Sequence, residues 1–191
     1  MKRAAIIAGV VGFGLGALAG ATVFFGWPML SHRGAVATPS HPKFSEVQWP
    51  HPTDEWGKGK AFRCAATDCG VEVNLYMRAK IGFCNCQTGV SDDAELERLS
   101  DFSLMGDKVS VLAPGRQINV AWMKGRSRAY AIVAPYRAPN SALSVAFNDR
   151  CDAVVATAII DHDQPGAIEP KVIDFLNSKT VVHWAEVTLG L

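Results

Sequence analysis

The hydrophobic and polar positions of this 191-residue chain separate a charge-free beginning from a patterned remainder. Lys2 and Arg3 precede residues 4–30, which contain no charged side chain. A helix rises about 1.5 Å per residue, so this run would extend about 40 Å and exceed the roughly 30 Å of a bilayer's hydrocarbon core. The pattern therefore predicts one transmembrane helix.

Two interpretations of this leader compete. Residues 17–19 and 19–21 each match the small-x-small site at which a signal peptide is cleaved. The apolar run continues past both sites to Leu30, however, and Trp27 suits a membrane interface. We therefore expect residues 1–30 to remain as an anchor in a bacterial inner membrane. The basic residues 2–3 favour a cytoplasmic N-terminus and a periplasmic C-terminal domain.

Small residues recur along one side of the predicted helix. Gly12, Gly16 and Gly20 are four residues apart, which is slightly more than one helical turn. Such a stripe lets a second helix approach closely, and close packing drives association between helices in lipid. The stripe predicts contact with another membrane protein or with a second copy of this chain.

The remainder divides into a linker and a folded domain. Residues 31–56 contain four prolines, few aliphatic residues, and the aromatic residues Trp49 and Trp56, which we expect to dock on the domain. Residues 57–191 have the length of one typical domain. Without Lys2 and Arg3, 17 basic residues stand against 18 acidic ones. Near-neutrality disfavours a nucleic-acid partner.

Alternation of apolar and polar residues predicts a strand-rich domain. Residues 71–78 show the period of two that is typical of a half-buried strand. Residues 118–122 and 130–132 predict a hairpin that turns at 124–127. The apolar, β-branched run at 153–160 predicts a central strand. Two further strands are expected at 142–147 and 180–189.

Two short helices are expected between these strands. Asp92 followed by Glu95 resembles a capping box, with Leu96 and Leu99 forming the buried stripe. A second helix is expected from residues 169–170 to Asn177. The fold class is therefore α+β, mostly antiparallel β with two short helices, preceded by one N-terminal transmembrane helix.

Five cysteines are the most specific chemical feature of the domain: Cys64, Cys69, Cys84, Cys86 and Cys151. In an oxidising compartment they are expected to form disulfides, each contributing about 2–4 kcal/mol. One possibility is that Cys64 and Cys69 each bond one of Cys84 and Cys86, which form a C-x-C pair. The other is that Cys151 bonds one of these four cysteines and leaves one of them free. Spacing does not decide the connectivity. Cys151 is the candidate free thiol.

The first four cysteines permit two other interpretations. Four thiolates converging from Cys64, Cys69, Cys84 and Cys86 would suit zinc or copper, although the spacing is unusual for such a site. Alternatively, Cys84 and Cys86 form a redox-active dithiol whose pKa is lowered by nearby Arg78 and Lys80. The leading interpretation, structural disulfides, requires no cofactor.

The remaining candidate is a basic cluster. Lys124, Arg126 and Arg128 could contact an anionic partner, or they could form an ordinary solvated turn. We find no G-x-S-x-G, P-loop or H-E-x-x-H motif in the sequence, and we assign no catalytic residue. The expected function is a non-catalytic accessory or assembly subunit of a membrane complex. The alternative is thiol-redox or metal handling through the cysteines.

Overall fold

The computed structural model describes residues 42–106, 108–133, 140–162 and 164–191. The predicted transmembrane helix, its glycines at positions 12, 16 and 20, and the first part of the predicted linker lie outside these residues. Within the described ranges, no helix is long and apolar enough to cross a membrane.

One antiparallel sheet organises the described part of the chain. Its eight strands run in the order β1-β2-β3-β8-β7-β6-β4, and β5 also pairs with β6. The strands are β1 (Phe44–Val47), β2 (Lys60–Cys64), β3 (Val73–Lys80), β4 (Val109–Val111), β5 (Arg116–Val120), β6 (Met123–Ile132), β7 (Asn140–Asp149) and β8 (Asp152–Ile160). The helices are α1 (Ala66–Cys69), α2 (Asp93–Leu99), α3 (Phe102–Met105), α4 (Pro165–Leu176) and α5 (Lys179–Leu189).

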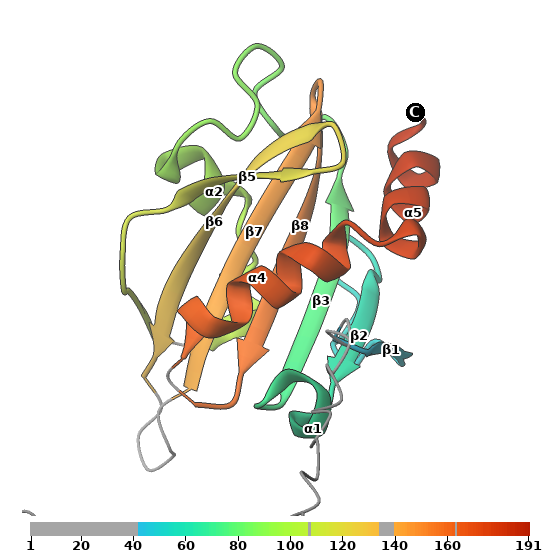
Figure 1. Cartoon of the computed structure of the whole chain (residues 1–191). Coiled ribbons are helices and arrows are strands. Elements are labelled where there is room, and N and C mark those ends of the chain that lie inside the picture. The colour runs from blue at the N-terminus through green and yellow to red at the C-terminus, as the bar shows by residue number, and fades with distance from the viewer. Residues whose placement is uncertain (1–41, 107, 134–139, 163) are drawn as a thin grey trace, which may run out of the picture. The chain divides into compact units, whose positions relative to one another are not determined.

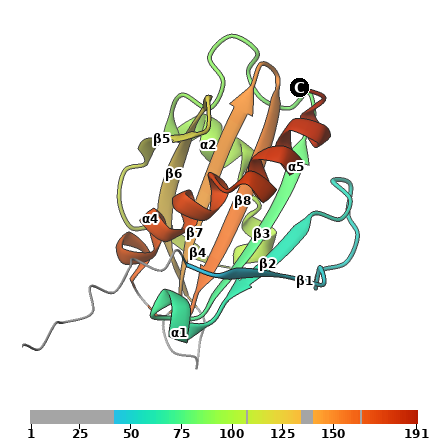
Figure 2. The same cartoon turned by 45° about the vertical axis from the view of Figure 1, so that its right-hand side comes forward.

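Both faces of the sheet are covered. Helices α4 and α5 lie across one face, and α2 lies on the other (Figures 1 and 2). The alternation in β3 sends Val73, Leu75 and Met77 into the larger core beside α4 and α5. A smaller core on the opposite face contains Leu96 and Leu99 of α2. The domain is thus α+β with a mostly antiparallel sheet, as the pattern predicted.

The strongest local patterns are confirmed. The apolar run at 153–160 forms β8, which lies between β3 and β7 and is buried along nearly its whole length. Asp92 caps α2, because its side chain accepts a hydrogen bond from the backbone N–H of Glu95 at 2.8 Å. Leu96 and Leu99 are fully buried.

The prediction of a last strand at 180–189 is wrong, because this segment forms α5. The side chain of Ser178 caps the helix, and the buried residues are Val181, Ala185 and Leu189. Residues four apart lie on one face of a helix and also on one face of a strand, so their spacing fits both structures. His183 is exposed on the surface of this helix.

The predicted hairpin exists, but its turn is misplaced. Antiparallel pairing of β5 with β6 joins Val120 to Met123, so the turn lies at Ala121-Trp122. Gly125 lies within β6 instead of in the turn. A Cβ atom there would lie 2.2 Å from the carbonyl oxygen of Ala146, which means that glycine permits the close approach of β7.

The described residues contain five helices where two were expected. The four-residue helices α1 and α3 are additional, and α4 begins at Pro165 instead of at residues 169–170. Pro165 suits the first turn because its missing N–H has no helical partner there. Glu169 is buried inside α4, where it bonds Ser127 and Arg116 of the sheet. Asn177 follows α4 as its C-cap, as expected.

Part of the segment expected to be a linker belongs to the sheet. Residues 44–47 form β1, which pairs with β2 at one edge. Farther along, Trp49 and His51 pack edge-to-face against Tyr76 of β3, with ring centroids 5.9 Å and 4.7 Å from that of Tyr76. Trp56 lies over the ammonium group of Lys80 at 4.8 Å. The two tryptophans dock on the domain as predicted.

A buried group of charges joins this segment to the rest of the fold. Asp101 accepts from Arg78 Nε at 2.7 Å and from Lys80 Nζ at 2.8 Å. The three residues are only 2–6% exposed. Arg78 also bonds Asp54 at 2.7 Å, and Lys80 donates to the carbonyl oxygen of Leu99 at 2.6 Å. The cluster therefore connects β3, the α2–α3 junction and the segment before β2.

Asp101→Asn tests the importance of this cluster. The substitution leaves two buried cations facing a neutral amide, and removing one partner from a buried ion pair typically costs about 3–5 kcal/mol. We expect urea unfolding to show a loss of this size in the free energy of unfolding. Glu46→Gln breaks the exposed pair with Lys60 and should cost less than about 1 kcal/mol. Equal losses in the two variants would contradict the role given to Asp101.

Candidate functional site

The five cysteines occupy opposite ends of the sheet. Cys64 is bonded to Cys69, and Cys86 is bonded to Cys151. Cys64, at the end of β2, pairs with Val73, and Val73 pairs with Ile160, the last residue of β8. Cys151 lies at the other end, immediately before the first residue of β8. Nine residues of β8 separate the two ends by roughly 26 Å at about 3.3 Å per residue.

This connectivity corrects two expectations. The four sulfurs of Cys64, Cys69, Cys84 and Cys86 do not gather in one place, so they do not form a four-thiolate zinc or copper site. Cys151, expected to be free, is bonded, and Cys84 is the free cysteine. Among the described residues, no group of three or more potential metal ligands is placed to hold an ion.

The hairpin between β7 and β8 explains the pairing of Cys151. Asp149 pairs with Asp152, so Arg150 and Cys151 form the turn, and Arg150 adopts a positive φ of 53°. The sequence contained a signal for this position, because two apolar strands flank residues 149–152. Recognising the turn would have placed Cys151 at the tip of the β7–β8 hairpin, whereas its nearness to the loop after β3 also depends on the pairing of β3 with β8.

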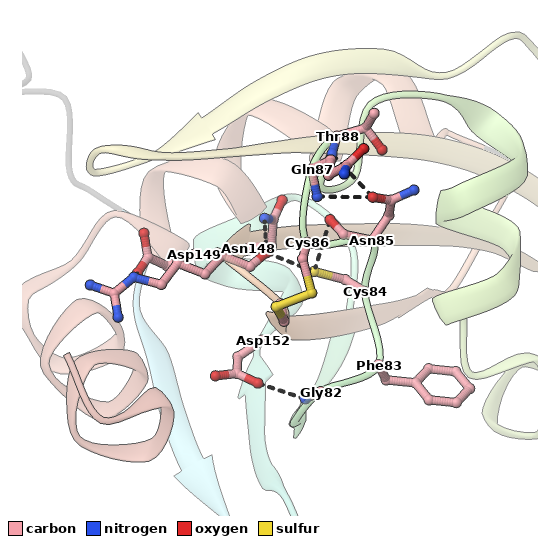
Figure 3. The surroundings of a disulfide bond; sticks show 12 residues. Gly82, Phe83, Cys84, Asn85, Cys86, Gln87, Thr88, Asn148, Asp149 and Asp152 are labelled. Carbon is pink, nitrogen blue, oxygen red and sulfur yellow. Dashed lines mark hydrogen bonds and ion pairs between the residues drawn. A yellow bond between two sulfur atoms is a disulfide. The ribbon is translucent and has the colours of Figure 1, made fainter.

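That loop, residues 81–91, is fixed by hydrogen bonds that its backbone N–H groups donate to nearby side chains. The backbone N–H of Gly82 donates to Asp152 Oδ1 at 2.6 Å (Figure 3). The side-chain oxygen of Asn85 accepts from the N–H groups of Gln87 and Thr88 at 2.9 Å and 3.2 Å. These bonds hold the C-x-C segment in a turn, because an Asn side chain can replace a backbone acceptor in such turns.

Asn148 ties the same loop to the sheet. Its side-chain oxygen accepts from the N–H of Val90 at 2.9 Å, and its side-chain nitrogen donates to the carbonyl of Arg150 at 3.0 Å. Gly89 adopts a φ of +59°, and a Cβ atom there would lie 2.4 Å from Asn148 Oδ1. The loop and the β7–β8 turn are therefore held together by polar contacts as well as by the disulfide.

Cys84 lies against this turn. Its backbone N–H donates to the carbonyl of Cys151 at 3.0 Å, and its thiol donates to the carbonyl of Arg150 at 3.1 Å. Figure 3 shows Cys84 beside the bond between Cys86 and Cys151. Cys84 is 6% exposed, whereas Cys86 is exposed and Cys151 is half-buried.

The electrostatic surroundings keep Cys84 as a neutral thiol. Burial raises its pKa most strongly, the carboxylates of Glu95 and Asp152 raise it further, and Arg98 opposes them. The expectation that Arg78 and Lys80 lower a thiol pKa at this site is wrong. Both cations are paired with Asp101 instead. We therefore expect the buried Cys84 thiol to react slowly.

The basic residues expected to meet an anionic partner are distributed differently. Arg126 is paired with Asp93, and Arg128 is paired with Glu97, so these cations attach α2 to the sheet. Of the three residues, only Lys124 is exposed. An anionic partner would therefore meet one accessible cation in place of a cluster of three.

Neither the protein-family models nor the curated proteins contain a match to this chain. Its candidate site therefore rests on the geometry of Cys84, Cys86 and Cys151.

Counting thiols tests this arrangement. In guanidinium without reductant, N-ethylmaleimide should add one label per chain, on Cys84. In the native protein at pH 7 the same label should be incorporated about tenfold more slowly or worse, because a buried neutral thiol is a poor nucleophile. Cys84→Ser should remove the label entirely. Labelling of Cys151, or more than one label per chain, would contradict the connectivity.

Proposed function

We propose that this protein is a single-pass, membrane-anchored accessory or assembly subunit whose folded domain works in the bacterial periplasm. The observation that carries the proposal is the pair of disulfides, Cys64–Cys69 and Cys86–Cys151. Structural disulfides persist in oxidising compartments such as the periplasm and are rare in the cytosol. They agree with the orientation expected from the basic residues before the charge-free run.

The position of exposed apolar residues at one end of the sheet supports a role in contacting a partner. Phe44, near the start of the described chain, pairs with Cys64, so the chain enters the sheet at the end that carries Cys64–Cys69. Ile81 and Trp122 lie at the opposite end, beside Lys80 and Lys124, and are 57% and 55% exposed. These exposed apolar side chains therefore lie at the end of the sheet opposite to the end at which the chain enters it.

The leader supports a membrane partner. Its glycines at positions 12, 16 and 20 would allow close packing of a second membrane helix, either from another protein or from a second copy of this chain. We therefore assign association to the leader and partner contact to the domain. The thiol-redox alternative retains support only at Cys84, Cys86 and Cys151.

Gly16→Leu tests the proposed association. The added side chain would separate the two helices, so about tenfold less partner should be retained on full-length protein purified in mild detergent, equivalent to about 1.4 kcal/mol. Gly14→Leu is the matched control, because Gly14 lies off the stripe formed by residues 12, 16 and 20. Thermal unfolding of the domain should be unchanged in both variants.

Two outcomes would contradict the proposal. One is that the wild-type chain migrates alone after gentle extraction, without a second protein or a second copy. The other is that Gly14→Leu and Gly16→Leu weaken retention equally, since that result would show a general effect on membrane insertion.

A further inference from the structure

We propose that Cys84 and Cys86 compete for Cys151, so that the domain can exchange a buried thiol for an exposed one without any external oxidant. This activity goes beyond the accessory role and does not depend on it. The site consists of three cysteines from two segments, the loop after β3 and the β7–β8 turn. They are about 65 residues apart in sequence but adjacent in the fold.

The contacts identify Cys151 as the sulfur that Cys84 would attack. The hydrogen bond from the Cys84 N–H to the Cys151 carbonyl places the two backbones side by side at 3.0 Å. The thiol itself points to the adjacent residue, bonding the Arg150 carbonyl at 3.1 Å. Attack on Cys86 would instead close a strained ring across Asn85. The geometry therefore favours a Cys84–Cys151 product.

The exchange is balanced within the chain. Cys84 loses its proton to solvent, and its thiolate attacks the sulfur of Cys151. The bond between Cys86 and Cys151 breaks as the bond between Cys84 and Cys151 forms. Cys86 leaves as a thiolate and takes up a proton. One disulfide and one thiol are present before and after the step, so no electrons are gained or lost.

The consequence is a change in which thiol solvent can reach. Before the exchange, the thiol is buried on Cys84, and afterwards it lies on exposed Cys86. An exposed thiolate can attack a disulfide of another protein, forming a mixed disulfide and releasing one thiol of that protein. The class of molecule that the exchanged form would meet is thus a disulfide-bonded protein of the same compartment.

The surroundings of Cys84 set the resistance to exchange. Burial and the carboxylates of Glu95 and Asp152 disfavour its thiolate, and Arg98 favours it. Arg98 is itself bound to Glu95 through two hydrogen bonds, at 3.0 Å and 2.6 Å. Rearrangement must also break the bond from the thiol to Arg150. These features slow the exchange, and the form that the structure shows is the one with Cys86 bonded.

A variant with one cysteine fewer tests the competition directly. In Cys86→Ser, expressed as the full chain in the periplasm, Cys84 should bond Cys151, so the denatured protein should contain no free thiol. Cys64→Ser is the matched control. It leaves Cys69 without a third cysteine at its end of the sheet, so two thiols, Cys69 and Cys84, should be labelled. Two free thiols in Cys86→Ser would overturn the proposal.

The wild-type chain provides a test that does not depend on a variant folding. Protein held at pH 7, 8 or 9 without reductant is quenched in acid, labelled and digested with trypsin. Because no lysine or arginine lies between residues 84 and 86, the label must be located by fragmenting the peptide that spans residues 81–98.

We expect label on Cys86, together with a peptide in which Cys84 is linked to Cys151. The initial rate of this conversion should rise about tenfold per pH unit below the thiol pKa, following the thiolate fraction. Cys84→Ser should show no label on Cys86 at any pH. Label confined to Cys84 at every pH would overturn the proposal, as would equal labelling of Cys86 in Cys84→Ser.

Discussion

The fold depends on one buried carboxylate that lies between two cations of the same strand. Asp101 pairs with both Arg78 and Lys80, which the alternation of β3 directs away from the larger core, and Asp54 supplies a second carboxylate to Arg78. Buried charges are tolerated only when they are paired and hydrogen-bonded. The pairing thereby fixes the α2–α3 junction against the sheet, and it gives Asp54 and the tryptophans before β2 a surface on which to dock.

The two ends of the sheet are secured by different means. At one end, Cys64–Cys69 closes a loop of only a few residues around α1. At the other, Cys86–Cys151 joins distant segments and is reinforced by Asn148 and Asp152. The second end combines a covalent link, a free thiol and a hydrogen-bonded loop. This end of the sheet therefore contains both the free thiol and the contacts that stabilise the fold.

Local patterns predicted the fold class because most of its evidence is local. The run that forms β8 and the cap at Asp92 each depend on neighbouring residues. Contacts between residues that are distant in the sequence could not be predicted from such local patterns. Gly125 looks like a turn residue until the close approach of Ala146 is known, and residues four apart in α5 fit a strand equally well. The cysteine pairing depended on a turn at residues 150–151 that brings Cys151 to the loop after β3.

Strand order also imposes a sequence of events on folding. The β2–β3 hairpin and the Cys64–Cys69 bond require only neighbouring residues, so both can form early in folding. The second edge of β3 can pair only after β8 is in place, because Val73 of β3 pairs with Ile160 of β8. Until β8 arrives, one edge of β3 has no partner and is open to aggregation. Closure of the Cys86–Cys151 bond, across a sequence separation of 65, holds the start of β8 beside the end of β3 and so favours the pairing that covers this edge.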